Sequence, residues 1–425
     1  MKILVIGSGG REHAIVWKLR QSPLADEVYC VPGNAGISSE AICRGGDIVS
    51  PRLMADLAAE IGADLTVVGP EAPLVAGIAD EFRSRNLRIV GPDAQAARLE
   101  GSKVFAKQFL RDSGVPTADF LVLESPEDVA RNIGAFGFPV VLKADGLAAG
   151  KGVLILDKES EARAAAELML AGKIAGPAGR RAVLERFLPG EEVSFIVLSD
   201  GAGYYALPSA RDHKAVYDGD RGPNTGGMGA YSDGAILSEA EKQGILQRIV
   251  EPTLDRLYKA GCPYRGFLYF GLMMTAEGPQ VLEFNVRLGD PEAQALLFRL
   301  ESDLVPLLQC AAQGAGITDV AVKWSSGPAV CVVLASAGYP GHYEQGYEIF
   351  GIDEAEELGA KVFHAGTKFV EGRLVTAGGR VLGVTAGGED LPAAIDNAYA
   401  AVAKIRFEGM HYRRDIGVKG LARLQ

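Results

Sequence analysis

Short apolar runs alternate with amphipathic stretches through the first hundred residues. The runs with the length and composition of buried strands are residues 3–6, 27–31, 64–68 and 87–90. The stretches that place apolar residues at helical spacing are residues 11–21, 51–61 and 74–85. Strands that alternate with helices in this way form a parallel sheet covered on both faces. The sequence therefore predicts an N-terminal parallel α/β domain built from βαβ units.

The pattern changes after residue 102, where strand pairs and helices follow one another less regularly. The expected helices are residues 102–113, 127–134, 159–171 and 239–258. The expected strands are residues 120–123, 140–143, 153–156, 182–187, 192–198, 266–275 and 280–285. The polar, glycine-rich segment 211–229 is expected to be a long loop. This order is typical of α+β structure with antiparallel strand pairs.

The last hundred residues are rich in expected strands. These are residues 329–335, 361–365, 373–377 and 380–386, and a helix is expected at 391–405. At roughly 150 residues per domain, a chain of 425 residues has room for about three domains. We expect domains at 1–101 (α/β), 102–325 (α+β) and 326–425 (β-rich).

Charge and cysteine content narrow the range of partners. The net charge is −11 and the pI is about 5.2, so a strong overall attraction to nucleic acid or to an anionic membrane is not expected. No apolar run reaches the roughly 18 residues of a membrane span, and we expect no signal peptide at the N-terminus. The five cysteines lack CxxC spacing, which favours reduced, mostly buried thiols.

The first strand ends in the turn at residues 7–13, which reads Gly-Ser-Gly-Gly-Arg-Glu-His and opens a helix. Free amides at a helix N-terminus bind anions, and Arg11 is placed to assist them. The segment is a poor dinucleotide fingerprint, because the third glycine of GxGxxG is missing and the second strand lacks an acidic residue for a ribose. A phosphate or substrate site is favoured, and a purely structural turn is the alternative.

The segment 141–153 carries the sharpest local signal. Lys143 ends one strand, a loop of small residues follows, and Lys151 precedes the next strand. Small residues allow backbone amides to approach phosphate oxygens, and the two lysines can offset phosphate charge. The loop is not a Walker A motif, since no GxxxxGK[ST] leads into a helix. Phosphate binding is favoured over a plain hairpin turn.

Polar residues alternate with apolar ones in the strand at 282–287. At a period of two, Glu283, Asn285 and Arg287 share one face of that strand. Carboxylate and amide oxygens suit Mg²⁺ held together with nucleotide phosphates, and an arginine can clamp a carboxylate or phosphate. A solvated face of an edge strand is the alternative.

Two further segments have weaker signals. The long segment 211–229 is expected to be a substrate loop, in which His213 is either a general base or, more commonly for a loop histidine, a hydrogen-bond partner. The strand at 182–187 runs into an apolar hinge and the acidic pair Glu191 and Glu192. A hinge backbone can bind a purine edge and a carboxylate can bind ribose hydroxyls, although an ordinary strand–turn–strand remains the simpler interpretation.

Taken together, these segments resemble the phosphoribosylamine–glycine ligase family, a group of ATP-grasp enzymes of de novo purine synthesis. The resemblance runs almost from end to end. The segments that carry it are GSGGREHA at 7–14, GPEAPLVAGIAD at 69–80, SKVFAK at 102–107, LKADGLAAGKGV at 142–153, DGDRGPNTGGMGAY at 218–231, RLGDPEAQ at 287–294, ASAGYPG at 335–341 and VFHAGT at 362–367.

The resemblance implies a reaction in which ATP phosphorylates the glycine carboxylate and the amine of 5-phosphoribosylamine attacks the resulting acyl phosphate. It implies ATP and Mg²⁺ or Mn²⁺ as cofactors and a cytoplasmic location. The partners are small molecules, with no nucleic acid, membrane or obligate protein partner. It also implies that 1–101 is a substrate domain, that 102–325 is the ATP-grasp domain, and that 118–190 is a small lobe that folds over ATP.

The resemblance also implies roles for individual residues, of which Arg287 and Lys143 would be catalytic. The residues implied to hold ATP are Lys103, Lys143, Gly146, Gly150, Lys151, Gly152, Glu185, Phe187, Leu188 and Glu192. The implied metal ligands are Glu283 and Asn285. The residues implied to surround glycine and phosphoribosylamine are Gly9, Gly10, Arg11, Asp212, Lys214, Asn224, Thr225, Gly226, Gly227, Arg287 and Asp290.

Three alternatives differ in class. One is a related ATP-grasp ligase that takes another acid or amine. The second is a nucleotide-regulated binding module without catalysis, against which the retained Lys143, Glu283, Asn285 and Arg287 argue. The third is a dinucleotide-dependent oxidoreductase, which the missing acidic residue after the second strand disfavours.

Overall fold

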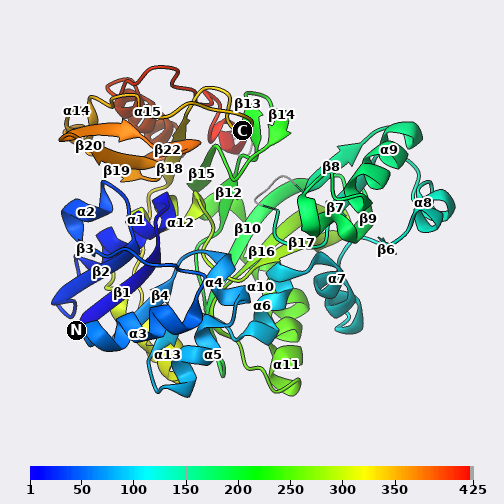
Figure 1. Ribbon diagram of the computed structural model, residues 1–425, viewed down its shortest axis with the longest axis horizontal. Coiled ribbons are helices and arrows are strands. Elements are labelled where there is room, and N and C mark those ends of the chain that lie inside the picture. The colour runs from blue at the N-terminus through cyan, green and yellow to red at the C-terminus, as the bar shows by residue number, and fades with distance from the viewer. Residues whose placement is uncertain (149–151, 422–425) are drawn as a thin grey trace.

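The computed structural model describes residues 1–148 and 152–421. The N-terminal part is a five-stranded parallel sheet in the order β3-β2-β1-β4-β5. Its strands are β1 (Lys2–Gly7), β2 (Glu27–Pro32), β3 (Ile42–Cys43), β4 (Leu65–Val68) and β5 (Ile89–Val90). Its helices are α1 (Gly10–Leu19), α2 (Ile37–Glu40), α3 (Pro51–Ile61), α4 (Glu71–Val75), α5 (Ile78–Ser84) and α6 (Ala94–Gly101). The expected α/β domain is present (Figure 1).

Local signals explain both the agreement and the differences in this part. Helix α3 matches its expected bounds, because Ser50 caps its first turn, Pro51 stands at the first helical position and Gly62 ends it in a left-handed conformation. The single helix expected at 74–85 is wrong. It is two short helices, α4 and α5, since Gly77 adopts a φ of +86° between them.

A second sheet of nine strands forms the centre of the molecule. Eight strands follow one another in the order β17-β16-β10-β12-β15-β18-β22-β19, and β11 pairs with β10. The strands from the central part are β10 (Glu191–Asp200), β11 (Tyr204–Ala206), β12 (Ala210–Asp212), β15 (Gly229–Ser232), β16 (Arg265–Thr275) and β17 (Gly278–Asn285). The strands from the C-terminal part are β18 (Ala329–Ala335), β19 (Lys361–His364) and β22 (Arg380–Gly387). The β15–β18 pairing makes the sheet continuous across the expected boundary near 326.

A small lobe stands apart on the right of Figure 1 and has its own four-stranded antiparallel sheet in the order β6-β9-β7-β8. Helix α7 (Lys103–Asp112) leads into it. Its elements are β6 (Phe120–Leu123), α8 (Pro126–Asn132), β7 (Val140–Ala144), β8 (Val153–Leu156), α9 (Glu159–Leu170), the 3₁₀ turn Gly176–Arg180 and β9 (Ala182–Arg186). Leu142, Leu184 and Met169 belong to an apolar core that is separate from the two larger cores.

The long loop expected at 211–229 is wrong, because most of this segment is paired. Strands β12 and β15 join the central sheet, and β13 (Ala215–Tyr217) and β14 (Arg221–Asn224) form a hairpin between them. The segment lacks apolar alternation because its glycine, asparagine and charged residues serve turns and the site. Its pairing comes instead from distant partners such as β18.

Helices and a second hairpin complete the chain. The helices are α10 (Glu239–Ile245), α11 (Glu251–Lys259), α12 (Glu292–Arg299), α13 (Val305–Gln313), α14 (Ile352–Glu356), α15 (Leu391–Val402) and α16 (Val418–Leu421). A π-helical turn at Leu246–Val250 joins α10 to α11, so the helix expected at 239–258 is continuous and contains one π-helical turn. The hairpin strands are β20 (Thr367–Val370) and β21 (Arg373–Thr376). Within 1–148 and 152–421, no helix combines the length and apolar character needed to cross a membrane.

Gly266, at the start of β16, is the point where the central sheet meets the N-terminal part. Its φ is +124°, and a Cβ built on it would lie 3.0 Å from the backbone N and Cα of Gly91. Real Cβ atoms are rarely found that close to backbone, and a non-glycine residue is strained at this φ. Gly91 and Gly266 therefore lie against each other where the N-terminal part meets the central sheet.

We predict that Gly266→Ala lowers the free energy of unfolding by clearly more than Gly261→Ala. Gly261 also has a positive φ, +79°, but a Cβ there would meet nothing within 4 Å. The control should lose about 1 kcal/mol from backbone strain alone. Urea denaturation of the two variants measures the difference. Equal losses would show that the close approach to Gly91 does not constrain the fold.

Candidate active site

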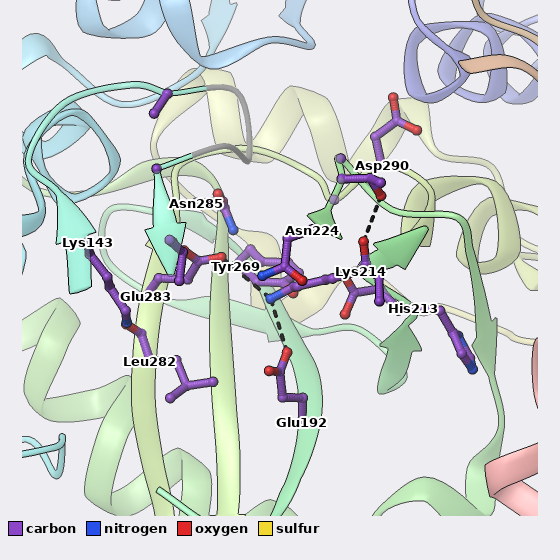
Figure 2. Close-up of a pocket in the computed structure, with 18 of the residues that line it drawn as sticks. Lys143, Glu192, His213, Lys214, Asn224, Tyr269, Leu282, Glu283, Asn285 and Asp290 are labelled. Carbon is purple, nitrogen blue, oxygen red and sulfur yellow. Dashed lines mark hydrogen bonds and ion pairs between the residues drawn. The ribbon is translucent and has the colours of Figure 1, made fainter. Parts of the chain in front are cut away.

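A cleft of about 1070 Å³ lies between the small lobe, the central sheet and the N-terminal part. Its wall includes side chains from β7 and β9 of the lobe, from β10, β12, β16 and β17 of the central sheet, and from the α1 and β22 regions. Figure 2 shows the centre of the cleft, where Glu283 and Asn285 lie among Lys143, Tyr269 and Lys214.

Lysines and one buried carboxylate occupy the end of the cleft beside the lobe. The carboxylate of Glu185, on β9, lies 2.9 Å from Lys107 Nζ and 3.0 Å from Lys143 Nζ, and its side chain is only 2% exposed. Burial alone would raise the pKa of Glu185, but the two lysines outweigh it and lower that pKa. Lys143 Nζ also donates to the Leu282 carbonyl at 2.9 Å. These contacts hold the Lys143 side chain in place near the end of β7.

Glu283 lies at the centre of a group of cations. Its carboxylate is 2.9 Å from Lys103 Nζ and 3.7 Å from Lys214 Nζ. Burial would raise the pKa of Glu283, but Lys103, Lys214 and Lys143 together hold it far below the usual range. The group therefore stays ionised at any physiological pH.

Glu283 and Asn285 share one face of β17 and offer a carboxylate and an amide oxygen to the cleft. Glu283 pairs across the ladder with Gly271, which has no side chain to fill the space beside it. These hard oxygen donors fit Mg²⁺ or Mn²⁺ bound together with phosphates, which would complete the coordination. Among the residues in 1–148 and 152–421, no group of three or more His, Cys, Asp or Glu side chains could hold a metal by itself.

Arg287 is held by two carboxylates. Its Nε is 3.0 Å from Glu71, its Nη2 is 2.9 Å from Glu100, and its Nη1 donates to the Leu288 carbonyl at 3.0 Å. Burial would lower the pKa of Arg287, but Glu100 and Glu71 raise it above its ordinary value. Most of its donors are thus already used, and Arg287 joins the end of β17 to α4 and α6.

Asp212 and Lys214, at the end of β12, face the cleft on the same side. Lys214 Nζ lies 3.1 Å from Glu192. Burial, then the nearby Glu292, Glu192 and Glu283, raise the pKa of Asp212, against the opposing effect of Lys214. Burial, with the surrounding carboxylates, therefore makes the Asp212 carboxyl hold a proton more readily than an ordinary aspartate.

His213 does not match either role expected for it. Its side chain is turned away from Glu283, on the far side of Lys214 (Figure 2), and is 4% exposed. Both ring nitrogens are buried and find no hydrogen-bond partner among residues 1–148 and 152–421, so the hydrogen-bonding role expected for His213 is not seen there. Burial, reinforced by Arg413, lowers the pKa of His213 to about 4.

The cleft gathers most of the residues that the sequence singled out. Those among its lining residues are Arg11, Lys103, Lys143, Gly146, Gly152, Glu185, Phe187, Leu188, Glu191, Glu192, Asp212, His213, Lys214, Asn224, Thr225, Gly226, Glu283, Asn285, Arg287 and Asp290. Three of the expected residues lie next to this lining rather than in it: Gly9 adjoins Asp290, Gly10 adjoins Gln294, and Gly227 adjoins Pro291. Gly150 and Lys151 lie outside the described residues.

Three sequence profiles match consecutive parts of the chain. Residues 1–100 match the N domain of phosphoribosylglycinamide synthetase, 101–293 its ATP-grasp (A) domain, and 329–419 its C domain. The chain belongs to the phosphoribosylglycinamide synthetase family.

The chain is similar to other proteins over its whole length. The chain is 49% identical to the phosphoribosylamine–glycine ligase of Pseudomonas aeruginosa, over 100% of this chain and 99% of that protein. It is 48% identical to the ligase of Agrobacterium fabrum, over 100% of this chain and 99% of that protein. The crystal structure of the phosphoribosylamine–glycine ligase from Thermotoga maritima superposes with a TM-score of 0.87 at 36% identity, covering 98% of this chain and 100% of that chain.

The fold extends to more distant proteins. A biotin carboxylase domain from Hydrogenobacter thermophilus superposes with a TM-score of 0.72 at 18% identity, covering 97% of this chain and 91% of that one. The expected fold class is confirmed: a parallel N-terminal sheet, an ATP-grasp centre and a C-terminal antiparallel part.

Several lining residues of this family member were not predicted from the sequence. They are Glu71, Glu100, Arg211, Tyr269, Glu292, Tyr339 and Arg380. Glu71 lies within the GPEAPLVAGIAD segment and Tyr339 within ASAGYPG, so family resemblance could have pointed to both. Arg380 lies in an ordinary β-rich stretch, and nothing local in the sequence marks it.

We predict that burial of neutral His213 makes the fold sensitive to acid. The folded pKa is about 4 and the unfolded value about 6.5, so the unfolded state binds more protons between those values. The stability that depends on neutral His213 is therefore complete above pH 6.5 and is lost as the pH falls toward 4. At pH 5 the loss should be about 2 kcal/mol.

Urea denaturation of the wild type and His213→Phe at pH 5 and pH 8 checks this. The variant should lose less stability than the wild type between the two values. The exposed His342, replaced by Gln, provides the matched control. A wild type and His213→Phe that lose stability in parallel would show that His213 titrates normally in the folded chain.

Proposed function

We propose that this chain is an ATP-dependent ligase that joins glycine to 5-phosphoribosylamine. The products are glycinamide ribonucleotide, ADP and phosphate, and the activity belongs to de novo purine synthesis. The observation that carries the proposal is that one cleft in this family member brings several lysines together with the carboxylate of Glu283 and the amide of Asn285. A cytoplasmic location accords with this role, since ATP is supplied there and all five cysteines are free.

We assign the cleft's two ends to different substrates. The residues we assign to ATP are Lys103, Lys143, Gly146, Gly152, Glu185, Phe187, Leu188 and Glu192, with Gly150 and Lys151 by resemblance alone. The residues we assign to glycine and the amine are Gly9, Gly10, Arg11, Asp212, Lys214, Asn224, Thr225, Gly226, Gly227, Arg287 and Asp290. Lysines at one end and a mixed acidic and basic set at the other support this division.

The reaction we propose has two bond exchanges. A carboxylate oxygen of glycine bonds to the terminal phosphorus of ATP as the bond to the bridging oxygen of ADP breaks, giving glycyl phosphate. The amine nitrogen then bonds to the acyl carbon, the bond from that carbon to the phosphate oxygen breaks, and the nitrogen gives up a proton. Such chemistry depends on positioning and charge neutralisation more than on a protein nucleophile.

Residues of the chain supply both the positioning and the charge neutralisation. Lys103 and Lys143 lie where they can offset phosphate charge, and the buried Glu185 keeps the Lys143 ammonium in place. Glu283 and Asn285 would hold Mg²⁺ or Mn²⁺, which supplies further charge neutralisation when bound. Arg287 is restrained by Glu71 and Glu100 and would orient a substrate carboxylate or phosphate with its remaining donor.

The proposal predicts that ADP release requires both glycine and the amine. The assay contains ATP, Mg²⁺ and phosphoribosylamine generated in the reaction mixture, with and without glycine. Release restored by another small amino acid but not by glycine would retain the ATP-grasp chemistry and change the acid. No release with any acid, while ATP still binds, would favour a binding module without catalysis.

We predict that Glu283→Gln removes metal-dependent turnover and leaves the fold intact. The amide keeps the shape of the side chain but removes a charge that the metal and the surrounding lysines need, so kcat should fall by at least about 10²-fold. The exposed Glu277→Gln, in the turn between β16 and β17, is the control for an equal change of charge. Unchanged activity of Glu283→Gln at saturating Mg²⁺ would contradict the metal assignment.

A further inference from the structure

Arg380 is one of the residues of the C-terminal part that line the cleft, and it lies in no motif that marked it in the sequence. It begins β22, and its side chain is 22% exposed at the cleft wall. Its Nη1 donates to the Gly226 carbonyl at 2.6 Å and to the Asp290 carbonyl at 2.7 Å, with the Gly227 carbonyl at 3.4 Å. Its Nη2 lies 3.2 Å from the Asp290 carboxylate.

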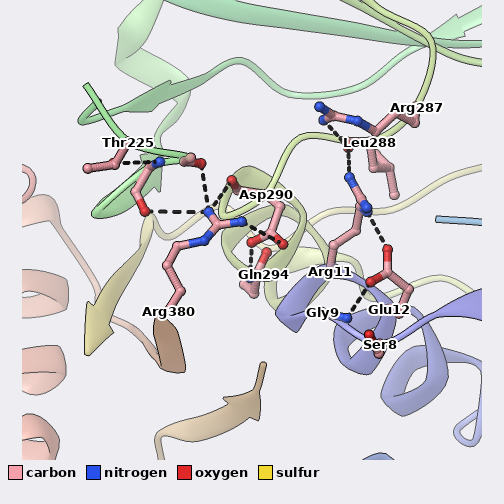
Figure 3. Close-up of polar contacts among 12 residues, drawn as sticks. Ser8, Gly9, Arg11, Glu12, Thr225, Arg287, Leu288, Asp290, Gln294 and Arg380 are labelled. Carbon is pink, nitrogen blue, oxygen red and sulfur yellow. Dashed lines mark hydrogen bonds and ion pairs between the residues drawn. The ribbon is translucent and has the colours of Figure 1, made fainter. Parts of the chain in front are cut away.

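These contacts join two segments that are distant in the sequence (Figure 3). One is the turn at Thr225–Gly227 that follows the β13–β14 hairpin, and the other is the turn at Asp290 that follows β17. The planar guanidinium presents several donors in fixed directions, so it can satisfy carbonyls and a carboxylate together. A lysine ammonium could keep the charge pair but not this fork.

The turn has other restraints as well. The Thr225 N–H and its Oγ1 both donate to the Lys214 carbonyl at 2.8 Å. The Gly226 N–H donates to the Tyr339 hydroxyl at 3.1 Å, and the Gly227 N–H donates to Thr225 Oγ1 at 2.9 Å. Gly227 has a φ of +112°, and a Cβ on it would lie 2.5 Å from Pro291 Cδ. The turn therefore packs directly on the segment that carries Asp290.

Asp290 in turn adjoins the N-terminal part. Gln294 donates to its carboxylate at 2.9 Å, and a Cβ built on Gly9 would lie 3.2 Å from its Oδ2. Arg380 thus joins the turn to Asp290, and Asp290 lies beside the glycine turn that follows the first strand. All three segments belong to the end of the cleft assigned above to glycine and the amine.

We propose that Arg380 is a positioning residue for the glycine and amine end of the site, acting through the turn at Thr225–Gly227 and through Asp290. The inference rests on the proposed function for its kinetic part. The ATP end, at Lys103 and Lys143, has no contact with Arg380 among the interactions of the described residues. Loss of Arg380 therefore affects the two ends of the cleft unequally.

The kinetic test compares Arg380→Met and Arg380→Lys with Arg373→Met in the full-length chain. Arg373 is an exposed arginine of the neighbouring hairpin, paired with the exposed Glu371. Arg380→Met should lower kcat/KM for glycine and the amine by about 10- to 100-fold, the size expected when substrates are misplaced by about 1 Å. The affinity for ATP should change by less than about threefold. Arg380→Lys should recover part of the loss, and Arg373→Met should behave like the wild type.

A second variant approaches the same contact from the other side. Gly226 does not have a positive φ, but a Cβ on it would lie 3.1 Å from Arg380 Cζ. Gly226→Ala should therefore displace the guanidinium and reproduce the selective loss without removing a charge. If either variant lost affinity for ATP as much as for glycine, the proposal would be overturned. Arg380 would then have a general structural role.

Hydrogen exchange measured by mass spectrometry, without substrates, separates this inference from the proposed function. Residues 224–229 should exchange at least about tenfold faster in Arg380→Met than in the wild type or Arg373→Met, because their turn loses its contacts with Arg380 and Asp290 and keeps only those with Lys214 and Tyr339. The buried strand β18 should keep its protection. Unchanged exchange at 224–229 overturns the inference even if the wild type is an active ligase. Faster exchange there would support the structural part even if the wild type released no ADP with glycine.

Discussion

Buried charge is the constraint on which the rest of this structure depends. Glu185 lies between Lys107 and Lys143 with almost no contact with water, and each of the three comes from a different element. Removing one partner from such a group costs about 3–5 kcal/mol, because a charge is then left uncompensated in the interior. Helix α7 and strands β7 and β9 must therefore keep a common arrangement. The lobe sheet has its own apolar core, but its orientation at the cleft is fixed by charges.

The same principle runs along the cleft. Glu283 is surrounded by lysines, Arg287 by two carboxylates, and Arg380 by Asp290 and backbone carbonyls. Each pair satisfies a group that would be costly to bury alone. The cleft can thus present many charges to small, highly charged substrates. The fold itself is shared with a biotin carboxylase domain at 18% identity.

Sequence patterns predicted the elements whose signals are local. Strands β6 and β8 coincide with their expected bounds because each is an apolar run, and helix α3 does so because Ser50 caps its start and Gly62 its end. The strands β12 and β15 were missed, because their residues lack apolar alternation and because β15 also pairs with β18, about a hundred residues later. Glu283 and Asn285 were found from a period of two. Glu100 and Arg380 were not predicted, because the residues that they contact lie 187 and 90 positions away in the sequence.

The continuity of the central sheet affects how far the chain can be divided. Strand β15 pairs with β12 on one side and with β18 on the other, although β18 lies about a hundred residues later. A shortened protein ending before β18 would present a row of unpaired N–H and C=O groups along the buried strand Gly229–Ser232. Such edges attract other strands, so the shortened chain would tend to self-associate. Three family regions can be named along this sequence, but the second and the third share one continuous sheet.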